Sequence, residues 1–354
     1  MYKASVLATA GLLIVASLFV YAYTRGPDDD GKLKFGQKPF ENFEISNVAS
    51  IVFEANGKEP TELKRDAFYR WQVQAEPAVF PADEMKMRSF FVQLMNMQVG
   101  DRIPGGELHP QAFGFPNSGD ALPQPIGEAG GRFSLRGEDK KVLFEIHSGK
   151  ARTIGDGTYV RFGNKPDVYL IAENIAPAYE ANYWLEKEIA NVDGEGIAAI
   201  EFLASKGSSR IERVSAGAPW KEKRFGGASP VLTPRFAKNI LPRLTDSLKE
   251  LRFVQLMPRK SNALLEKYKI STIGIETFSG TYYTVALYRR PGSGPNSSTP
   301  FYATFEVRLV SGKDLGKYEA ISLVSNVATF NHKNAPWFFV LDDASTKRFL
   351  VNEP

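Results

Sequence analysis

Apolar and polar residues alternate along much of the chain, and this period of two is typical of β-strands with one buried face. The alternating segments are enriched in aromatic and β-branched residues, which favour strands. They are Arg132–Leu135, Val142–Ile146, Thr158–Phe162, Val168–Ile171, Thr272–Thr277, Tyr282–Tyr288, Phe301–Phe305 and Trp337–Leu341. The pattern predicts two groups of half-buried antiparallel strands.

Helical spacing precedes each group of strands. Apolar residues three and four apart form one stripe at Met87, Phe90, Phe91, Leu94 and Met97, and another at Phe236, Ile240, Leu244, Leu248 and Leu251. Asp83 and Thr233 stand before these stripes as N-cap residues, and Pro234 follows at the first helical position. Pro242 falls inside the second stripe, where we expect it to bend or split the helix.

The two halves of the chain resemble each other. Val48–Phe53 is similar to Ile197–Phe202, and a tryptophan follows 20 positions after the central isoleucine in both, at Trp71 (71 − 51) and Trp220 (220 − 200). We therefore predict an α+β fold with two tandem modules, at residues 41–190 and 191–354, the second a degenerate repeat of the first. Each module is expected to be an antiparallel sheet with one main helix packed on it.

A long uncharged run lies near the start of the chain. Ala4–Thr24 holds 21 residues without a charged side chain, and a helix of that length spans roughly 30 Å, the thickness of a hydrocarbon core. We predict a transmembrane helix within residues 1–25 and a linker at residues 26–40. Lys3 favours a cytoplasmic N-terminus, which predicts a single-pass inner (cytoplasmic) membrane protein with a periplasmic body. A cleavable signal peptide ending at Val20-Tyr21-Ala22 is the alternative.

The composition excludes several classes of reactive and metal-binding site. The chain of 354 residues has no cysteine, three histidines and a formal net charge of +4. Thiol nucleophiles, zinc–thiolate sites and iron–sulfur clusters are therefore excluded, and the small charge does not favour nucleic acid as a partner. The phosphate-binding motif G-x-x-x-x-G-K-[ST] and the catalytic motifs H-E-x-x-H, G-x-S-x-G and S-x-x-K are absent.

Residues with metal-binding or catalytic potential are scattered. His109, His147 and His332 lie far apart, and the carboxylates of Asp28–Asp30 lie in the polar linker, where a solvated charge run is expected. The glycine-rich stretch Gly149–Gly157 lies between two predicted strands, which favours a hairpin connection over an anion site. We therefore predict no catalytic, cofactor-binding or metal-binding residue, and we expect no cofactor.

Two M-x-M pairs lie in the first helical stripe, at Met85/Met87 and Met95/Met97. Thioether sulfur is a ligand for copper(I). Residues two apart on a helix point about 200° away from each other, so only one methionine of each pair is able to face the core. Core packing is the favoured interpretation.

The order of these features resembles the domain of unknown function 4340 family. The matching residues in the first module are Ile51, Phe53, Leu63, Arg65, Trp71, Val73, Pro81, Ala82, Asp83, Phe113, Gly114, Phe115, Tyr159, Val160, Val168, Tyr169, Leu170 and Ile171. The second module retains Arg213 and Trp220 but has Leu232-Thr233 in place of Ala-Asp. The resemblance implies a membrane-anchored extracytoplasmic protein associated with an ABC-type transport system akin to the gliding-motility auxiliary components, and it implies no site residue.

These observations favour a non-enzymatic protein. The leading hypothesis is a membrane-anchored auxiliary or scaffold subunit of an ABC-type transport or envelope machine, with an ABC permease and further auxiliary subunits as protein partners. The alternative is a periplasmic binding module for an envelope glycan or lipid, which requires a groove lined by aromatic side chains. An enzyme is a third hypothesis, and it requires carboxylates from separate strands to converge in a pocket.

Overall fold

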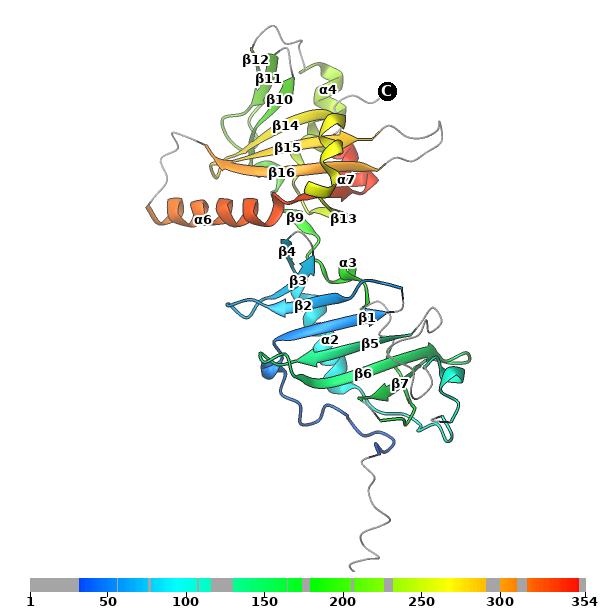
Figure 1. Ribbon diagram of the computed structural model, residues 1–354. Helices are drawn as coiled ribbons and strands as arrows, with labels where there is room; N and C mark the ends of the chain where they lie inside the picture. The colour runs from blue at the N-terminus through cyan, green and yellow to red at the C-terminus, as the bar shows by residue number, and fades with distance from the viewer. Residues whose placement is uncertain are drawn as a thin grey trace, which may run out of the picture.

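Two antiparallel sheets, stacked end to end, make up most of the molecule (Figure 1). The structure is a computed structural model, and it describes residues 32–349 apart from 56, 76–77, 107, 116–129, 164, 174–178, 205–206, 226–231, 291–299 and 311–316. The first sheet has eight strands and the second has nine. Every strand pairing in both sheets is antiparallel, as the alternating pattern predicts.

The strands of the first sheet are, in spatial order, β4 (Ala78–Pro81), β3 (Trp71–Ala75), β2 (Thr61–Arg65), β1 (Ser50–Ala55), β5 (Gly131–Arg136), β6 (Val142–Ala151), β7 (Thr158–Phe162) and β8 (Tyr169–Ile171). Those of the second sheet are β12 (Lys221–Phe225), β11 (Gly207–Glu212), β10 (Ile197–Ala204), β14 (Lys269–Thr277), β15 (Thr281–Arg289), β16 (Phe301–Leu309), β17 (Trp337–Leu341), β13 (Leu251–Pro258) and β9 (Glu188–Ala190).

The two sheets share one strand order. The run β3-β2-β1-β5-β6-β7-β8 of the first sheet corresponds to β12-β11-β10-β14-β15-β16-β17 of the second. The similarity continues beyond β8. In module two, β13 pairs with β17, and at the corresponding place in module one the Gly100 amide donates to the Leu170 carbonyl oxygen of β8 (2.7 Å). The strand order therefore agrees with the repeat seen in the sequence, and we refer to the two sheets with their helices as module one and module two. The exact module limits stay a prediction.

Helices cover one face of each sheet. In module one, α2 (Glu84–Asn96) begins at Asp83, whose carboxylate accepts the backbone N–H groups of Met85 and Lys86 as an N-cap. In module two, Thr233 caps α4 (Pro234–Asn239), and α5 (Leu241–Thr245) follows at once. The predicted break at Pro242 is confirmed, because proline removes the hydrogen bond that would continue α4.

The remaining helices lie in connections and in module two. They are η1 (Ile45–Asn47), η2 (Pro110–Phe113), α3 (Ala181–Trp184), η4 (Gly194–Gly196), η5 (Lys260–Tyr268), α6 (Lys317–Asn334) and α7 (Asp343–Phe349).

The predicted α+β class with one main helix in each module is wrong. The fold is mostly β, built on two large antiparallel sheets. The helical stripe of module two is divided between the short α4 and α5, and the longest described helix is instead α6, with 18 residues. Pro242 accounts for the break between α4 and α5. The helix α4 ends at Asn239 and α5 ends at Thr245, so each is shorter than three helical turns.

The predicted membrane location is corrected as well. Among the helices of the described residues, none is long and apolar enough to cross a membrane, which contradicts the expected single-pass inner-membrane protein. Even α6 has serine, asparagine and threonine between its apolar residues. Ala4–Thr24, on which the prediction rested, lies outside the described residues.

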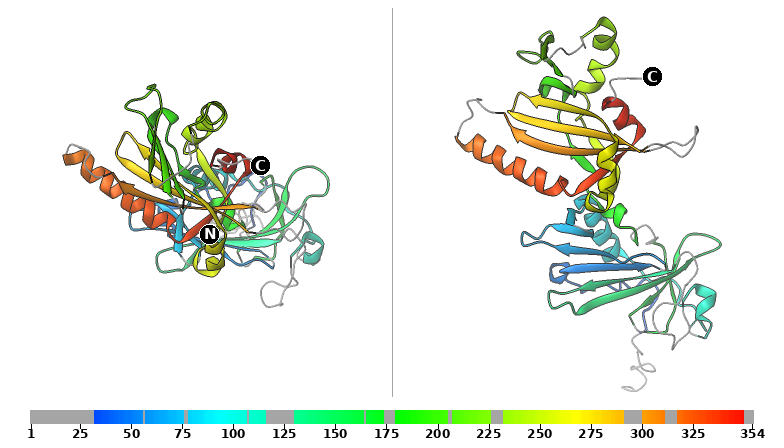
Figure 2. Two further views of the ribbon diagram at one scale, coloured as in Figure 1. Left: turned by 90° about the horizontal axis from the view of Figure 1, so that it is seen from above. Right: turned by 45° about the horizontal axis from the view of Figure 1, so that its top comes forward.

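One large hydrophobic core runs through both modules, and a smaller buried cluster around Tyr288 and Phe338 lies in module two. Phe80 of β4 is fully buried, and its ring meets those of Phe253 (5.6 Å between centroids) and Trp337 (6.4 Å) in module two. The Lys333 ammonium at the end of α6 lies 5.4 Å from the Phe80 ring and 3.3 Å from the Glu186 carboxylate. These contacts join the modules into one elongated body, which is seen from the side in Figure 1 and in the right-hand view of Figure 2, whereas the left-hand view looks along its length.

Candidate functional site

The buried Arg213 connects three segments near the start of the second sheet. Arg213, directly after β11, donates hydrogen bonds from its guanidinium to the carbonyl oxygens of Gly194 (2.6 Å) and Ile197 (2.9 Å). The Trp220 ring lies against the same guanidinium, with 4.8 Å between the Arg213 Cζ atom and the ring centroid. One buried cation therefore joins η4, β10 and the approach to β12 through charge-assisted hydrogen bonds and a cation–π contact.

The same arrangement is present in module one. The Arg65 guanidinium donates to the carbonyl oxygens of Ser46 (3.1 Å) and Ile45 (3.4 Å) in η1, and it lies 4.9 Å from the Trp71 ring centroid. Burial lowers the pKa of Arg65 from its ordinary value. The arginine and tryptophan positions that carry the sequence resemblance thus brace the first strands of both sheets, which is a structural role.

A groove of about 600 Å³ lies between the modules. Its lining combines side chains from β3, β4, the start of α2, the segment before β9, β13 and the end of α6, and most of them are charged or polar. The lining residues are Arg70, Trp71, Gln72, Val79, Pro81, Ala82, Asp83, Glu84, Met85, Glu186, Lys187, Glu188, Arg252, Thr329, His332 and Lys333. Two of its carboxylates are already engaged, since Asp83 caps α2 and Glu186 pairs with Lys333.

Lys187 is the most perturbed basic group of this groove. Its ammonium donates to the Asn182 side-chain oxygen and to the Val254 carbonyl oxygen (2.9 Å), and it lies 4.8 Å from the Phe253 ring centroid. Burial, followed by repulsion from Lys86 and Arg252, lowers the pKa of Lys187 to about 8. Three cations from α2, the connecting segment and β13 therefore meet at the module boundary.

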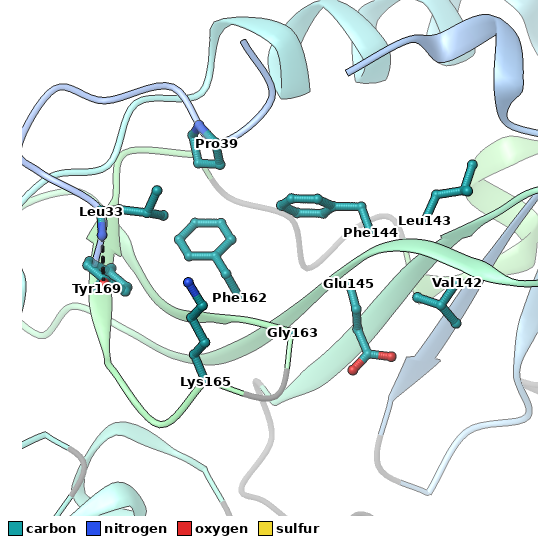
Figure 3. Close-up of a pocket in the computed structure, with 10 residues that line it drawn as sticks. All are labelled: Leu33, Pro39, Val142, Leu143, Phe144, Glu145, Phe162, Gly163, Lys165 and Tyr169. Atoms are coloured by element: carbon teal, nitrogen blue, oxygen red, sulfur yellow. Dashed lines mark hydrogen bonds between the residues drawn. The ribbon is translucent and has the colours of Figure 1, made fainter. Parts of the chain in front are cut away.

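A second concavity, of about 540 Å³, lies in module one and is largely apolar (Figure 3). The strands β6 and β7 form its floor, and the extended segment before η1 forms a wall. Its lining residues are Leu33, Pro39, Val142, Leu143, Phe144, Glu145, Phe162, Gly163, Lys165 and Tyr169. We call this concavity the module-one pocket. Its volume falls within the range of small-ligand and side-chain binding pockets.

Hydrogen bonds hold the wall of the module-one pocket in place. The Leu33 backbone N–H donates to the Tyr169 hydroxyl oxygen (3.1 Å), as drawn in Figure 3. The Gly36 amide donates to the Val99 carbonyl oxygen (2.7 Å), and the Val99 amide donates to Gln37 (2.9 Å). Burial raises the pKa of Tyr169. These hydrogen bonds connect the wall to Tyr169 and Val99, and Glu145 and Lys165 supply the charged groups of the pocket.

The residues that the sequence singled out remain apart. His147 is hydrogen-bonded to Glu145 at 2.7 Å, a pairing that the sequence interpretation missed, while His332 lines the groove between the modules. Within the described residues, no group of three or more histidine, aspartate or glutamate side chains is placed to hold a metal ion. Gly149–Gly157 spans the hairpin between β6 and β7, as predicted, and Asp28–Asp30 lie outside the described residues.

The methionines of α2 follow the helical geometry. Met87 and Met97 are buried, whereas Met85 is exposed. Met95 is half-buried and packs against the core. The prediction that one member of each pair faces the core is confirmed for Met85/Met87, and the buried members fill the space between sheet and helix.

Sequence patterns alone did not identify the module-one pocket. The signal that was available is the run Val142-Leu143-Phe144, where three consecutive apolar residues break the alternation of a strand. A register shift between β5 and β6 at this point exposes Val142 and Leu143, at 45% and 38%, while Phe144 packs against the core. Apolar side chains thus reach the surface beside the pocket.

The chain matches the family described as "Domain of unknown function (DUF4340)" over residues 71–273, which is more than half of its length. It belongs to this family, as the order of motifs indicated. No curated protein and no solved structure matches the chain.

Proposed function

We propose that this protein is a non-enzymatic auxiliary or scaffold subunit of an ABC-type transport or envelope machine, and that it acts by binding protein partners. The observation that carries the proposal is the fusion of two repeated β-modules through a common core at Phe80, Phe253 and Trp337. Such a core fixes the two sheets relative to each other, so that one long body presents surfaces of both modules to a partner at a fixed spacing.

The charged side chains of the body support this proposal. Glu54, Arg132 and Glu145 form a ladder of ion pairs across three strands of module one. In module two, Arg210 of β11 pairs with Glu212 on the same strand and with Glu276 on β14. Charges paired with each other in this way stabilise a sheet surface. A ladder of this kind fits a surface that recognises a partner by shape and charge.

The ABC-type assignment rests on the family. The resemblance of the motif order to this family implies an ABC-type system akin to the gliding-motility auxiliary components. Among the residues of these motifs, Arg65, Trp71, Arg213 and Trp220 have a defined structural role. Two modules joined through one core suit a subunit that assembles with a permease and an ATPase. The energy source then belongs to the partner.

A ligand-binding module is the second candidate. The module-one pocket favours an apolar or amphipathic ligand, such as a lipid, because most of its lining is aliphatic or aromatic. The groove between the modules does not favour a glycan, because among its described lining residues Trp71 is the aromatic one and most others are charged. The lipid form of the alternative is therefore better supported than the glycan form.

Affinity purification from the native cells tests the leading proposal. An ABC permease is a membrane protein, so the tagged chain is extracted in a mild detergent and its companions are identified by mass spectrometry. Recovery of a permease and its ATPase in constant ratio to the chain is the expected result. Recovery of the chain alone, or with a bound lipid and no protein, would contradict the proposal, and the second of these outcomes favours the ligand-binding alternative.

A further inference from the structure

The repeat allows each position in module one to be matched with a position in module two. Starting from Ile51, the cross-strand neighbours lead to Leu135 on β5 and then to Phe144 on β6. Starting from Ile200, which occupies the same place in the repeat, they lead to Ile275 on β14 and then to Tyr283 on β15. Phe144 and Tyr283 are therefore equivalent.

The next strand extends the match. Ile146 on β6 is paired with Phe162 on β7, and Val285 on β15 is paired with Phe305 on β16. Phe162 is thus equivalent to Phe305. The floor of the module-one pocket, Phe144 and Phe162, has its counterpart in Tyr283 and Phe305 of module two.

In module two, this counterpart is covered by two helices of the same chain. The Phe330 ring of α6 meets the Tyr283 ring edge-on, with centroids 5.8 Å apart, and the Phe349 ring of α7 lies 6.4 Å from that of Phe305. The Asn331 side chain fixes α6 against the edge of β16, because it accepts the Val307 N–H (2.8 Å) and donates to the Val307 carbonyl oxygen (2.7 Å). The inner side of α6 carries the half-buried residues Leu323, Val327 and Phe330, at i, i+4 and i+7.

Among its described residues, module one has no such helix at the equivalent place. Its strands β7 and β8 are joined by residues 163–168, whereas α6 stands between β16 and β17. The segment before η1 covers part of the floor, with the Phe40 and Phe144 ring centroids 4.1 Å apart. The rest of the floor is the module-one pocket, and Val142 and Leu143 form its exposed rim.

We propose that the module-one pocket is the docking site for an amphipathic helix of a protein partner, which covers Phe144 and Phe162 as α6 covers Tyr283 in module two. This inference rests on the proposed scaffold function and names the surface through which it acts. The matching helix carries two aliphatic residues and an aromatic residue at i, i+4 and i+7, as α6 does, because an aromatic anchor entering an apolar pocket is a typical centre of a helix-in-groove interface.

Site-specific photo-crosslinking in the native cells tests the docking site. The photoreactive residue p-benzoylphenylalanine replaces Leu143 at the rim of the pocket or, as a matched control, Ile154, which is an 83% exposed aliphatic residue of the β6–β7 hairpin outside the pocket lining. The expected result is a crosslink from position 143, and at least tenfold less from position 154, to a partner peptide with the i, i+4, i+7 pattern. A second variant, Leu143→Glu, is expected to lose at least tenfold of the co-purified partner, while Ile154→Glu retains it.

The outcomes separate this inference from the scaffold function. If the partner co-purifies with both variants and crosslinks no more at position 143 than at 154, the docking site is wrong and the scaffold function stands. If no partner co-purifies with the wild-type chain, the scaffold function fails. A crosslink from position 143 to a second copy of this chain, or a lipid released from the wild-type chain and absent from Leu143→Glu, would also overturn the helix as occupant. Equal melting temperatures of the two glutamate variants confirm that both fold.

Discussion

The guanidinium of Arg213 lies 4.8 Å from the ring centroid of Trp220 while it donates hydrogen bonds to two carbonyl oxygens. Arg65 and Trp71 repeat this relationship in module one at 4.9 Å. The two pairs account for a pattern that the sequence shows twice, an arginine at the end of the second strand and a tryptophan before or at the start of the third. Each pair connects the second strand of its module to the chain at or before the first strand, at equivalent positions of the repeat.

Replacing Arg213 with lysine should destabilise the protein. Lysine lacks the planar fork that reaches Gly194 and Ile197 together, and its ammonium does not stack on Trp220 in the same way. Loss of one charge-assisted hydrogen bond and of the stacked contact predicts a decrease of about 2–4 kcal/mol in the free energy of unfolding, measured by urea denaturation. Arg65→Lys is the matched comparison, with an expected loss of about 1 kcal/mol because Arg65 is more exposed and its bonds are longer. Equal losses for the two variants would argue against this account of the brace.

Phe80→Ala should weaken the junction between the modules. The substitution removes a fully buried ring that contacts Phe253 and Trp337, and truncation of a buried phenylalanine typically costs about 3–5 kcal/mol. We expect calorimetry to show a lower melting temperature and a transition that separates into two, one for each module. Phe68→Ala removes an exposed ring and should change stability by less than about 0.5 kcal/mol. A single unshifted transition for Phe80→Ala would show that the modules do not depend on this contact.

Gly274→Ala tests the close approach of a tyrosine to β14. A Cβ atom at this position would lie 1.8 Å from the Tyr282 hydroxyl oxygen, which donates to the Glu201 carboxylate at 2.7 Å. Forcing the ring aside predicts a loss of about 1–3 kcal/mol. In the double variant Gly274→Ala/Tyr282→Val the clash is absent, so the combined loss should be smaller than the sum of the two single losses. Additive losses would mean that the two residues do not press on each other.

Lys187 predicts a specific pH dependence of stability. Burial and the neighbouring cations hold its pKa at about 8 in the folded protein, below the ordinary value of 10.5. The unfolded chain therefore binds more protons between these values, and the contribution of Lys187 to the free energy of unfolding rises as the pH increases from about 8 to 10.5. Urea denaturation across this range should show a steeper rise for the wild type than for Lys187→Met. Parallel curves for the two proteins would place the pKa of Lys187 near its ordinary value.

Much of the sheet structure could be predicted from the sequence. Strands lie at the indicated segments from Thr158–Phe162 to Trp337–Leu341, although only some alternate as expected: β7 does, whereas β17 is buried on both faces. The caps at Asp83 and Thr233 lie where short polar side chains are able to accept backbone N–H groups. The break at Pro242 followed from the missing N–H of proline. These features depend on local chemistry, which a single sequence carries.

The features that depend on tertiary contacts could not be predicted. The sequence did not show that α6 places Phe330 against Tyr283 and Lys333 against Phe80. The α+β class was wrong because two large antiparallel sheets dominate the fold, while the second helical stripe forms only the short α4 and α5. In module two, α6 covers the place that corresponds to the module-one pocket, and no described helix of module one does so. This difference becomes visible only when the two sheets are compared strand by strand.

We propose that this body holds a protein partner and does not work alone. Quantitative mass spectrometry of the wild-type chain purified from its native cells, compared with an untagged control, measures the quantity of permease and ATPase that co-purifies with it. Both proteins are expected in constant ratio to the chain and strongly enriched over the control. Recovery of the chain as a lone monomer, with both proteins at the level of the control, would contradict the proposal.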